Sequence, residues 1–163
     1  METISKKVIL LGHFGVGKTS LIKRFVHHSF SDEYLTTIGV KIDKKVIKVG
    51  NTNLSMIIWD IAGESTHKRI PESYKLGSHG AIYVIDVMRP STYENIDSEI
   101  LTLQKMMPSL SIIKVANKID LLIENEESML RNDLPLEKFT SCSAKTGENI
   151  EKVFSLLAKQ MLE

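Results

Sequence analysis

Residues 8–19 read VILLGHFGVGKT, a short apolar run that passes directly into a glycine-rich loop. The run at 8–11 is typical of a buried strand, and the residues after Thr19 have helical spacing. From Gly12 onward the loop matches G-x-x-x-x-G-K-[ST] at every specified position. Backbone N–H groups in such a loop hold phosphate oxygens, while Lys18 supplies a positive charge and Thr19 ligates Mg²⁺. The phosphates of a nucleoside triphosphate are therefore expected against His13, Phe14, Gly15, Val16, Gly17, Lys18, Thr19 and Ser20.

Short apolar runs alternate with longer amphipathic stretches along the rest of the chain. Strands are predicted at residues 8–11, 41–49, 54–60, 81–87, 112–116 and, weakly, 136–142. Helices are predicted at residues 19–28, 91–107 and 149–162. Gly50-Asn51 between two strand-like runs indicates an antiparallel hairpin. The pattern predicts an α/β fold with a mostly parallel six-stranded sheet, one antiparallel edge strand and helices on both faces.

Composition describes an ordinary globular chain. Its 163 residues, 42% hydrophobic and 25% charged, predict one domain over 1–163 and exclude a disordered or fibrous protein. The net charge of +1 gives no overall electrostatic attraction for nucleic acid or acidic membranes. The apolar runs are shorter than a membrane span. The lone cysteine, Cys142, indicates a reducing location and is expected to be a small core residue.

The motif Asn117-Lys118-Ile119-Asp120 indicates which base is bound. It follows the strand predicted at 112–116, and ligands bind beyond the carboxyl ends of strands in such sheets. The Asp120 carboxylate can accept hydrogen bonds from guanine N1–H and from the exocyclic amine, whereas adenine offers no such donor pair. Alone, this short pattern also fits a turn followed by a helix cap. After a phosphate loop it indicates a guanine nucleotide.

Together these motifs resemble the small GTPases of the Ras superfamily over essentially the whole chain, which implies a P-loop NTPase G domain. Residues 60–63, DIAG, resemble the D-x-x-G element, and residues 143–145, SAK, resemble the element that supports guanine. Thr37 resembles the switch I threonine that reaches Mg²⁺ and the γ-phosphate. Phe30 has the position of the aromatic residue that packs on guanine, and Tyr34 has that of the switch I tyrosine.

Within the superfamily, the sequence is most similar to the Rab family. The likeness lies in residues 37–40 (TIGV), 58–60 (IWD), 73–74 (SY) and 77–81 (GSHGA). It implies a switch that binds GTP or GDP with Mg²⁺ and hydrolyses GTP slowly to GDP and phosphate. Switch I, about 32–40, and switch II, about 60–76, would then present nucleotide-dependent surfaces to effectors, exchange factors and GAPs.

The resemblance also assigns roles to single residues. Thr19, Thr37 and Asp60 would hold Mg²⁺, and the Gly63 N–H would sense the γ-phosphate. Hydrolysis would depend on Lys18, Thr37, Gly63 and Glu64. The base would be held by Phe30, Asn117, Lys118, Asp120, Ser143, Ala144 and Lys145.

Two residues depart from the family pattern. Glu64 stands where the family usually has a glutamine that orients the attacking water. An ionised carboxylate can accept a hydrogen bond from that water, even as a general base, but it cannot donate to the phosphoryl group, and its charge repels that group's oxygens. The sequence alone leaves the sign of the net effect on the hydrolysis rate open. Phe14 stands where the family commonly has a small residue; it would crowd the space for a GAP's arginine finger unless it folds outward. A slow GTPase and a GTP-loaded scaffold that does not hydrolyse therefore both remain open.

The chain ends in KQMLE without a prenylation cysteine. A cytoplasmic protein is therefore expected, which would reach a membrane only through a further tail or a partner. Arg69, in the expected switch II, is interpreted as solvated or partner-facing.

Overall fold

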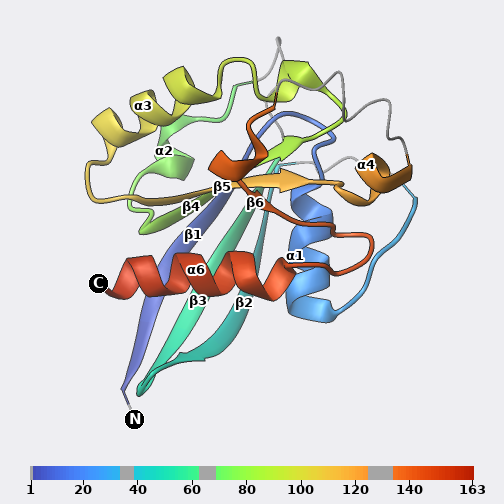
Figure 1. The fold of residues 1–163 in the computed structure, drawn as a ribbon. Coiled ribbons are helices and arrows are strands. Elements are labelled where there is room, and N and C mark those ends of the chain that lie inside the picture. Colours follow the sequence, from blue (N-terminus) through green and yellow to red (C-terminus); the bar gives the residue numbers. More distant parts are fainter. Residues whose placement is uncertain (1, 34–38, 63–68, 125–133) are drawn as a thin grey trace.

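A computed structural model describes residues 2–33, 39–62, 69–124 and 134–163. At its centre is a six-stranded sheet in the order β2-β3-β1-β4-β5-β6 (Figure 1). The strands are β1 (Thr3–Leu11), β2 (Val40–Val49), β3 (Thr52–Ile61), β4 (Gly80–Asp86), β5 (Ser111–Asn117) and β6 (Thr140–Ser141). Strand β2 pairs antiparallel with β3, and every other neighbouring pair is parallel. The predicted sheet with one antiparallel edge strand is confirmed.

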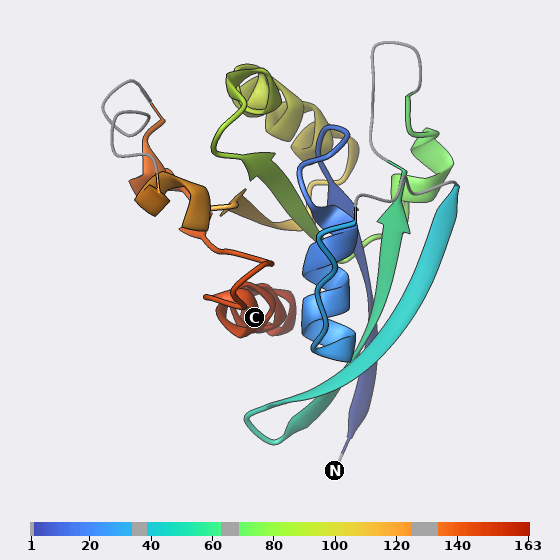
Figure 2. The ribbon, with the colours of Figure 1, turned by 90° about the vertical axis from the view of Figure 1, so that its right-hand side faces the viewer.

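Helices pack against both faces of this sheet, as predicted (Figure 2). One face is covered by α1 (Lys18–His27) and α6 (Ile150–Leu162), and the other by α2 (Glu72–Lys75) and α3 (Ile96–Met106). A further short helix, α4 (Asp120–Glu124), follows β5. Among the described residues, no helix has both the length and the apolar character needed to cross a membrane.

The central strands are buried on both sides, which explains why they read as continuous apolar runs. Val8 and Leu10 of β1 belong to the cluster beneath α1 and α6, while Ile9 and Leu11 face the cluster beneath α3. All residues of β4 are buried. Strands covered on both faces have no polar alternation to reveal their period, and runs of branched aliphatic residues mark them instead.

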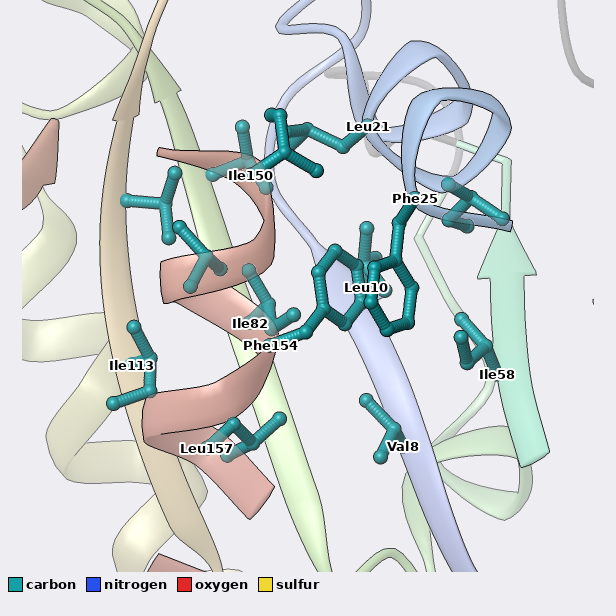
Figure 3. Packing of buried hydrophobic residues seen from close by; sticks show 14 of the residues in the cluster. Val8, Leu10, Leu21, Phe25, Ile58, Ile82, Ile113, Ile150, Phe154 and Leu157 are labelled. Atoms are coloured by element: carbon teal, nitrogen blue, oxygen red, sulfur yellow. The ribbon is translucent and has the colours of Figure 1, made fainter. Parts of the chain in front are cut away.

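An aromatic stack joins the two helices on the first face. The rings of Phe25 in α1 and Phe154 in α6 are stacked with centroids 3.7 Å apart and planes within 1° (Figure 3). Leu21 and Ile150 lie beside them in the same cluster. This packing fixes α1 on the sheet, and α1 carries the end of the glycine-rich loop at its first turn.

Several element boundaries differ from the sequence prediction. Strand β1 begins at Thr3 because it pairs with β3 from Thr3↔Asn53 onward, although this part is largely solvent-accessible and carries no apolar signal. Helix α3 begins only at Ile96, after a 3₁₀ turn over Pro90–Thr92. The stretch predicted as a strand at 136–142 forms a 3₁₀ turn over Leu136–Lys138 and pairs with β5 only at β6.

The parallel strands all end at one edge of the sheet, and the motif loops follow them there. From β1 the chain passes to the edge strand β2, comes back as β3 beside β1, and then places β4 on the opposite side of β1. Such a reversal in strand order opens a crevice at the carboxyl ends of the strands. This edge is therefore the expected location of a ligand site.

Candidate functional site

A pocket of about 330 Å³ opens at the carboxyl edge of the sheet. Three parts of the chain line it: the glycine-rich loop with the start of α1, the segment after α1, and the loops after β5 and β6. The predicted residues that line the pocket are Phe14, Gly15, Gly17, Lys18, Thr19, Ser20, Phe30, Asn117, Lys118, Asp120, Ala144 and Lys145. The structure thus brings the predicted phosphate and base residues around one cavity.

Within the described part of the chain, four predicted residues stand outside the lining: His13, Val16, Asp60 and Ser143. The imidazole of His13 lies 3.7 Å from the Glu99 carboxylate, at the side of the loop that faces α3. Val16 is fully buried in the core, and Ser143 is fully buried behind the base motif. Only the backbone of His13 and Val16 is therefore available for a phosphate contact, and Ser143 acts through its neighbours.

Four further predicted residues lie outside the described part of the chain. These are Tyr34 and Thr37 in the expected switch I, and Gly63 and Glu64 in the expected switch II. Their contributions to the metal site and to hydrolysis stay predictions from sequence.

Two glycines allow the loop to lie close to its neighbours. Gly12 has φ +140°, and a Cβ there would meet the backbone oxygen of Val84 at 2.3 Å. Gly17, at the N-cap of α1, has φ +102°, and a Cβ there would meet the Asn117 amide nitrogen at 2.4 Å. Any other residue at either position would strain the backbone and push the loop off β4 or off the base motif.

Lys18 places a buried positive charge in the loop. Its Nζ donates to the backbone oxygens of Gly12 at 2.9 Å and of His13 at 3.1 Å, and the residue is only 6% exposed. It is also the first residue of α1, where the helix dipole is positive. The ammonium and the helix terminus together make this end of the pocket a favourable place for an anion.

Thr19 and Asp60 form a pair of oxygen donors beside the loop. Thr19 Oγ1 donates to Asp60 Oδ2 at 2.7 Å, whereas Asp60 Oδ1 is buried and has no hydrogen-bond partner within the described residues. Burial raises the pKa of Asp60, against the opposing effects of the Thr19 hydrogen bond and the Lys18 charge. A buried carboxylate oxygen without a partner is costly unless a cation meets it. Hydroxyl and carboxylate oxygens are ligands that Mg²⁺ accepts, so these residues fit that ion.

Asn117 connects the phosphate half of the pocket to the base half. Its Nδ2 donates to the Val16 oxygen at 3.0 Å, and its Oδ1 accepts from the Ala144 N–H at 3.1 Å. The side chain is buried, so both bonds are shielded from water. Lys118 adds a second link, because its Nζ donates to the Gly15 oxygen at 2.8 Å.

Asp120 is held by the loop that follows β6. Ser143 Oγ donates to Asp120 Oδ1 at 2.7 Å, and Ser143 Oγ in turn accepts from the Thr146 N–H at 3.1 Å. This chain of bonds fixes the orientation of the Asp120 carboxylate at the pocket wall. A fixed acceptor pair there is what recognition of two adjacent donors on a base requires.

The structure adds a residue that the sequence analysis missed. Arg24 in α1 donates through Nε to the Ala144 oxygen at 2.9 Å and also hydrogen-bonds the Lys145 oxygen. Its guanidinium carbon lies 5.9 Å from the centre of the Phe30 ring. Arg24 therefore ties the base loop and the predicted base-stacking residue to α1. Nothing in the local sequence marks it, because its partners are far along the chain.

Phe14 is one of the residues that line the pocket. Its side chain lines the cavity and is 44% exposed, so it is neither packed in the core nor directed wholly away from the site. Its backbone oxygen accepts from Arg89 Nη2 at 2.7 Å.

Cys142 is a core residue, as predicted. It is fully buried next to the base motif, with Sγ 3.7 Å from Asn117 Oδ1. Burial, with a smaller effect of Glu148, raises the pKa of its thiol to about 12. The thiol is therefore protonated at neutral pH and is not a nucleophile of the site.

Comparison with known proteins gives the family. Residues 7–163 match the sequence profile of the Ras family. Ras-related protein Rab-1 of Theileria parva is 33% identical over 161 residues, covering 95% of this chain and 73% of that protein. Human Ras-related protein Rab-7b is 32% identical over 99% of this chain and 84% of its own length. Ras-related protein RabC of Dictyostelium discoideum is 32% identical over 98% of this chain and 85% of its own length. The chain therefore belongs to the Ras family, as a Rab-like small GTPase.

Proposed function

We propose that this protein is a switch that binds GTP or GDP with Mg²⁺ in the pocket over α1 and hydrolyses GTP slowly. The main support is that a phosphate-binding loop and a candidate base-recognition carboxylate line the same cavity. The glycine-rich loop with Lys18 forms one wall and the fixed carboxylate of Asp120 forms the other. A guanine nucleotide has an anionic end and a donor-bearing base that fit these two walls.

Each half of the pocket has a distinct task. The loop N–H groups and Lys18 bind the phosphates, with Thr19, Asp60 and, by the family likeness, Thr37 holding Mg²⁺. Bound Mg²⁺ neutralises phosphate charge. Asp120 accepts from guanine, and Phe30, backed by Arg24, packs on the ring. Switch I and switch II would change conformation when the γ-phosphate is lost and so present different surfaces to partners.

The hydrolytic half of the proposal rests on Glu64. As a carboxylate it can accept a hydrogen bond from the attacking water but cannot donate one to the phosphoryl group. Its negative charge opposes the charge that develops on that group, so the intrinsic rate should be low. Phe14, which lines the pocket and is partly exposed, would hinder an arginine finger, so finger-type GAPs should stimulate this protein weakly.

Nucleotide competition tests the binding half. Fluorescent GDP should be displaced by GTP and GDP but not by ATP at the same concentration. The variant Asp120→Ala should bind GDP roughly 100-fold more weakly, because two hydrogen bonds to a charged acceptor are lost. The control Asp97→Ala removes an exposed carboxylate from the first turn of α3 and should change nothing. Equal displacement by ATP and GTP would contradict guanine recognition.

Single-turnover hydrolysis tests the catalytic half. The protein is loaded with GTP, freed of excess nucleotide, and the release of phosphate is followed. Slow release over minutes to hours is expected. The Phe14→Gly, Glu64→Gln double variant should respond more strongly than wild type to a finger-type GAP. Absence of any phosphate release over hours would instead favour a GTP-loaded scaffold that signals without hydrolysis.

A further inference from the structure

The turn that follows β4 lies against the phosphate loop and holds two of its carbonyl groups. Arg89 Nη2 donates directly to the Phe14 oxygen at 2.7 Å. Asp86, at the end of β4, pairs through Oδ2 with Lys118 Nζ at 2.7 Å, and the same Nζ donates to the Gly15 oxygen at 2.8 Å. Two consecutive carbonyls of the loop are therefore connected to one short turn, once directly and once through Lys118.

Asp86 is held in place by hydrogen bonds to the turn, in addition to its ion pair with Lys118. It is 2% exposed, and its Oδ1 accepts from the Met88 N–H at 2.9 Å. Its own N–H donates to Thr92 Oγ1 at 3.0 Å. One carboxylate oxygen thus serves the turn while the other faces the Lys118 ammonium. A buried carboxylate anchored in this way gives its ion pair a defined geometry, and bonds of this charged kind are among the stronger ones.

Lys118 is a residue that needs such an anchor. Its backbone has φ +69°, in the left-handed region that favours glycine. Its side chain is 32% exposed, so water competes for the ammonium. The carboxylate of Asp86 holds the ammonium against the Gly15 oxygen in spite of that competition. A strained backbone at a ligand site persists only where the surroundings hold it in place.

These contacts determine where the N–H groups of the loop point. In a trans peptide unit the C=O and the following N–H point in opposite directions. Arg89 holds the Phe14 carbonyl and Lys118 holds the Gly15 carbonyl, so the planes of both peptide units are set. The directions of the Gly15 and Val16 N–H groups are then set as well. The Val16 N–H also donates to the His13 oxygen at 3.4 Å within the loop. N–H groups whose direction is largely set lose less conformational freedom when they bind an anion.

We propose that Asp86 and Arg89 are positioning residues that hold the phosphate loop in its nucleotide-binding form and so slow the release of bound nucleotide. The inference rests on the proposed function, because it concerns the same pocket. Neither residue lines that pocket; Asp86 acts through Lys118, and Arg89 acts through the loop backbone.

The test is the rate at which fluorescent GDP leaves the protein, in saturating Mg²⁺ and excess unlabelled GDP. The variant Asp86→Asn keeps the shape of the side chain and an oxygen for the Met88 N–H, but removes the negative charge facing Lys118. GDP release should become roughly tenfold faster, the size typical of losing a residue that orients a binding group. The matched control Asp97→Asn makes the same change at an exposed position of α3 and should leave the rate unchanged.

A double-mutant cycle separates positioning from a general loss of structure. If Asp86 acts through Lys118, then Asp86→Asn should add less than about twofold to the release rate in a Lys118→Ala background. A full tenfold addition in that background would overturn the assigned route. An unchanged release rate in the single variant Asp86→Asn would overturn the role of Asp86 itself.

Arg89 supplies an independent test if Asp86→Asn fails to fold. Arg89 is only half-buried and makes its contact at the surface, so Arg89→Gln should fold and speed GDP release about threefold. An unchanged rate in Arg89→Gln would overturn the proposal. If the wild-type protein bound no GDP, both the proposed function and the positioning role would be wrong. If the variants bound GDP and released it at the wild-type rate, only the positioning role would be wrong.

Discussion

Asp60 has a buried carboxylate whose surroundings favour a bound cation. Its carboxylate is buried, one oxygen accepts from Thr19, and the other has no partner within the described ranges. Burial raises its pKa above the ordinary value of 3.8, which means that the folded state disfavours the ionised form more than the unfolded chain does. The ionised form therefore costs stability unless a cation sits beside it.

The variant Asp60→Asn should separate the cost of burying the charge from the role of that charge in binding a cation. At neutral pH, without nucleotide or metal, it should be more stable than wild type, since the buried charge is gone. This advantage should shrink as the pH falls through the raised pKa and vanish below 3.8, where wild type is protonated in both states. Nucleotide binding by the variant should lose its dependence on Mg²⁺.

Thermal unfolding between about pH 3 and about pH 8, with a chelator and with excess Mg²⁺, measures both effects. Asp97→Asn serves as the exposed control on α3. A less stable Asp60→Asn protein at neutral pH without metal would show that the carboxylate is satisfied in the native state, which would remove the argument for a cation.

The sequence can point to residues whose chemistry is local, whereas it does not point to residues whose partners are distant along the chain. Lys18 and Thr19 could be predicted because they stand at a fixed spacing within one loop. Arg24 could not, because its partner Ala144 is 120 positions away. Asp86 reads as the polar end of a buried strand, and only the fold places Lys118 beside it.

Among the elements, α1 and α6 hold the site in place through the packing of their buried side chains. Their stacked Phe25 and Phe154 rings are fully enclosed in the core on that face (Figure 3). Because α1 begins at Lys18, loosening this contact should reach the phosphate loop. Buried aromatic pairs contribute beyond the area that they bury.

Phe154→Ala should therefore lower the free energy of unfolding by about 3–5 kcal/mol, the range for removing a buried aromatic side chain. Urea unfolding with no nucleotide present measures the loss, and a matched scan with GDP and Mg²⁺ shows how much the ligand restores. Lys152→Ala, exposed on the same helix, is the control. A loss below 1 kcal/mol would mean that α6 repacks easily and does not fix α1.

The long elements were predicted and the short ones were not, for a physical reason. Helix α6 has a full apolar face, and β4 is a continuous apolar run, so their period or composition is visible. Helices α2 and α4 are too short to develop a periodic face. Their conformation depends on what packs around them, which the local sequence does not contain.

At the scale of the whole molecule, the site exists only because the sheet brings loop ends together. Its lining runs from Phe14 after β1 to Lys145 after β6, and Asp60, near the end of β3, accepts a hydrogen bond from Thr19 of that lining. No single segment of the chain contains both walls. Nucleotide should therefore bind the folded chain and not the unfolded chain, which links occupancy to global stability.

Because of this linkage, bound nucleotide should stabilise the whole folded chain. At GDP and Mg²⁺ about 1,000-fold above the dissociation constant, binding should add about 4 kcal/mol to the free energy of unfolding. For a domain of this size the midpoint of thermal unfolding should rise by about 8–16 °C. ATP at the same concentration should shift it little, because Asp120 finds no donor pair on adenine, and a chelator should reduce the GDP effect by leaving the Asp60 carboxylate without its cation. Differential scanning calorimetry measures the shift in each case. An equal shift with ATP would mean that the phosphate loop alone provides the affinity and that the second wall of the pocket takes no part in recognition.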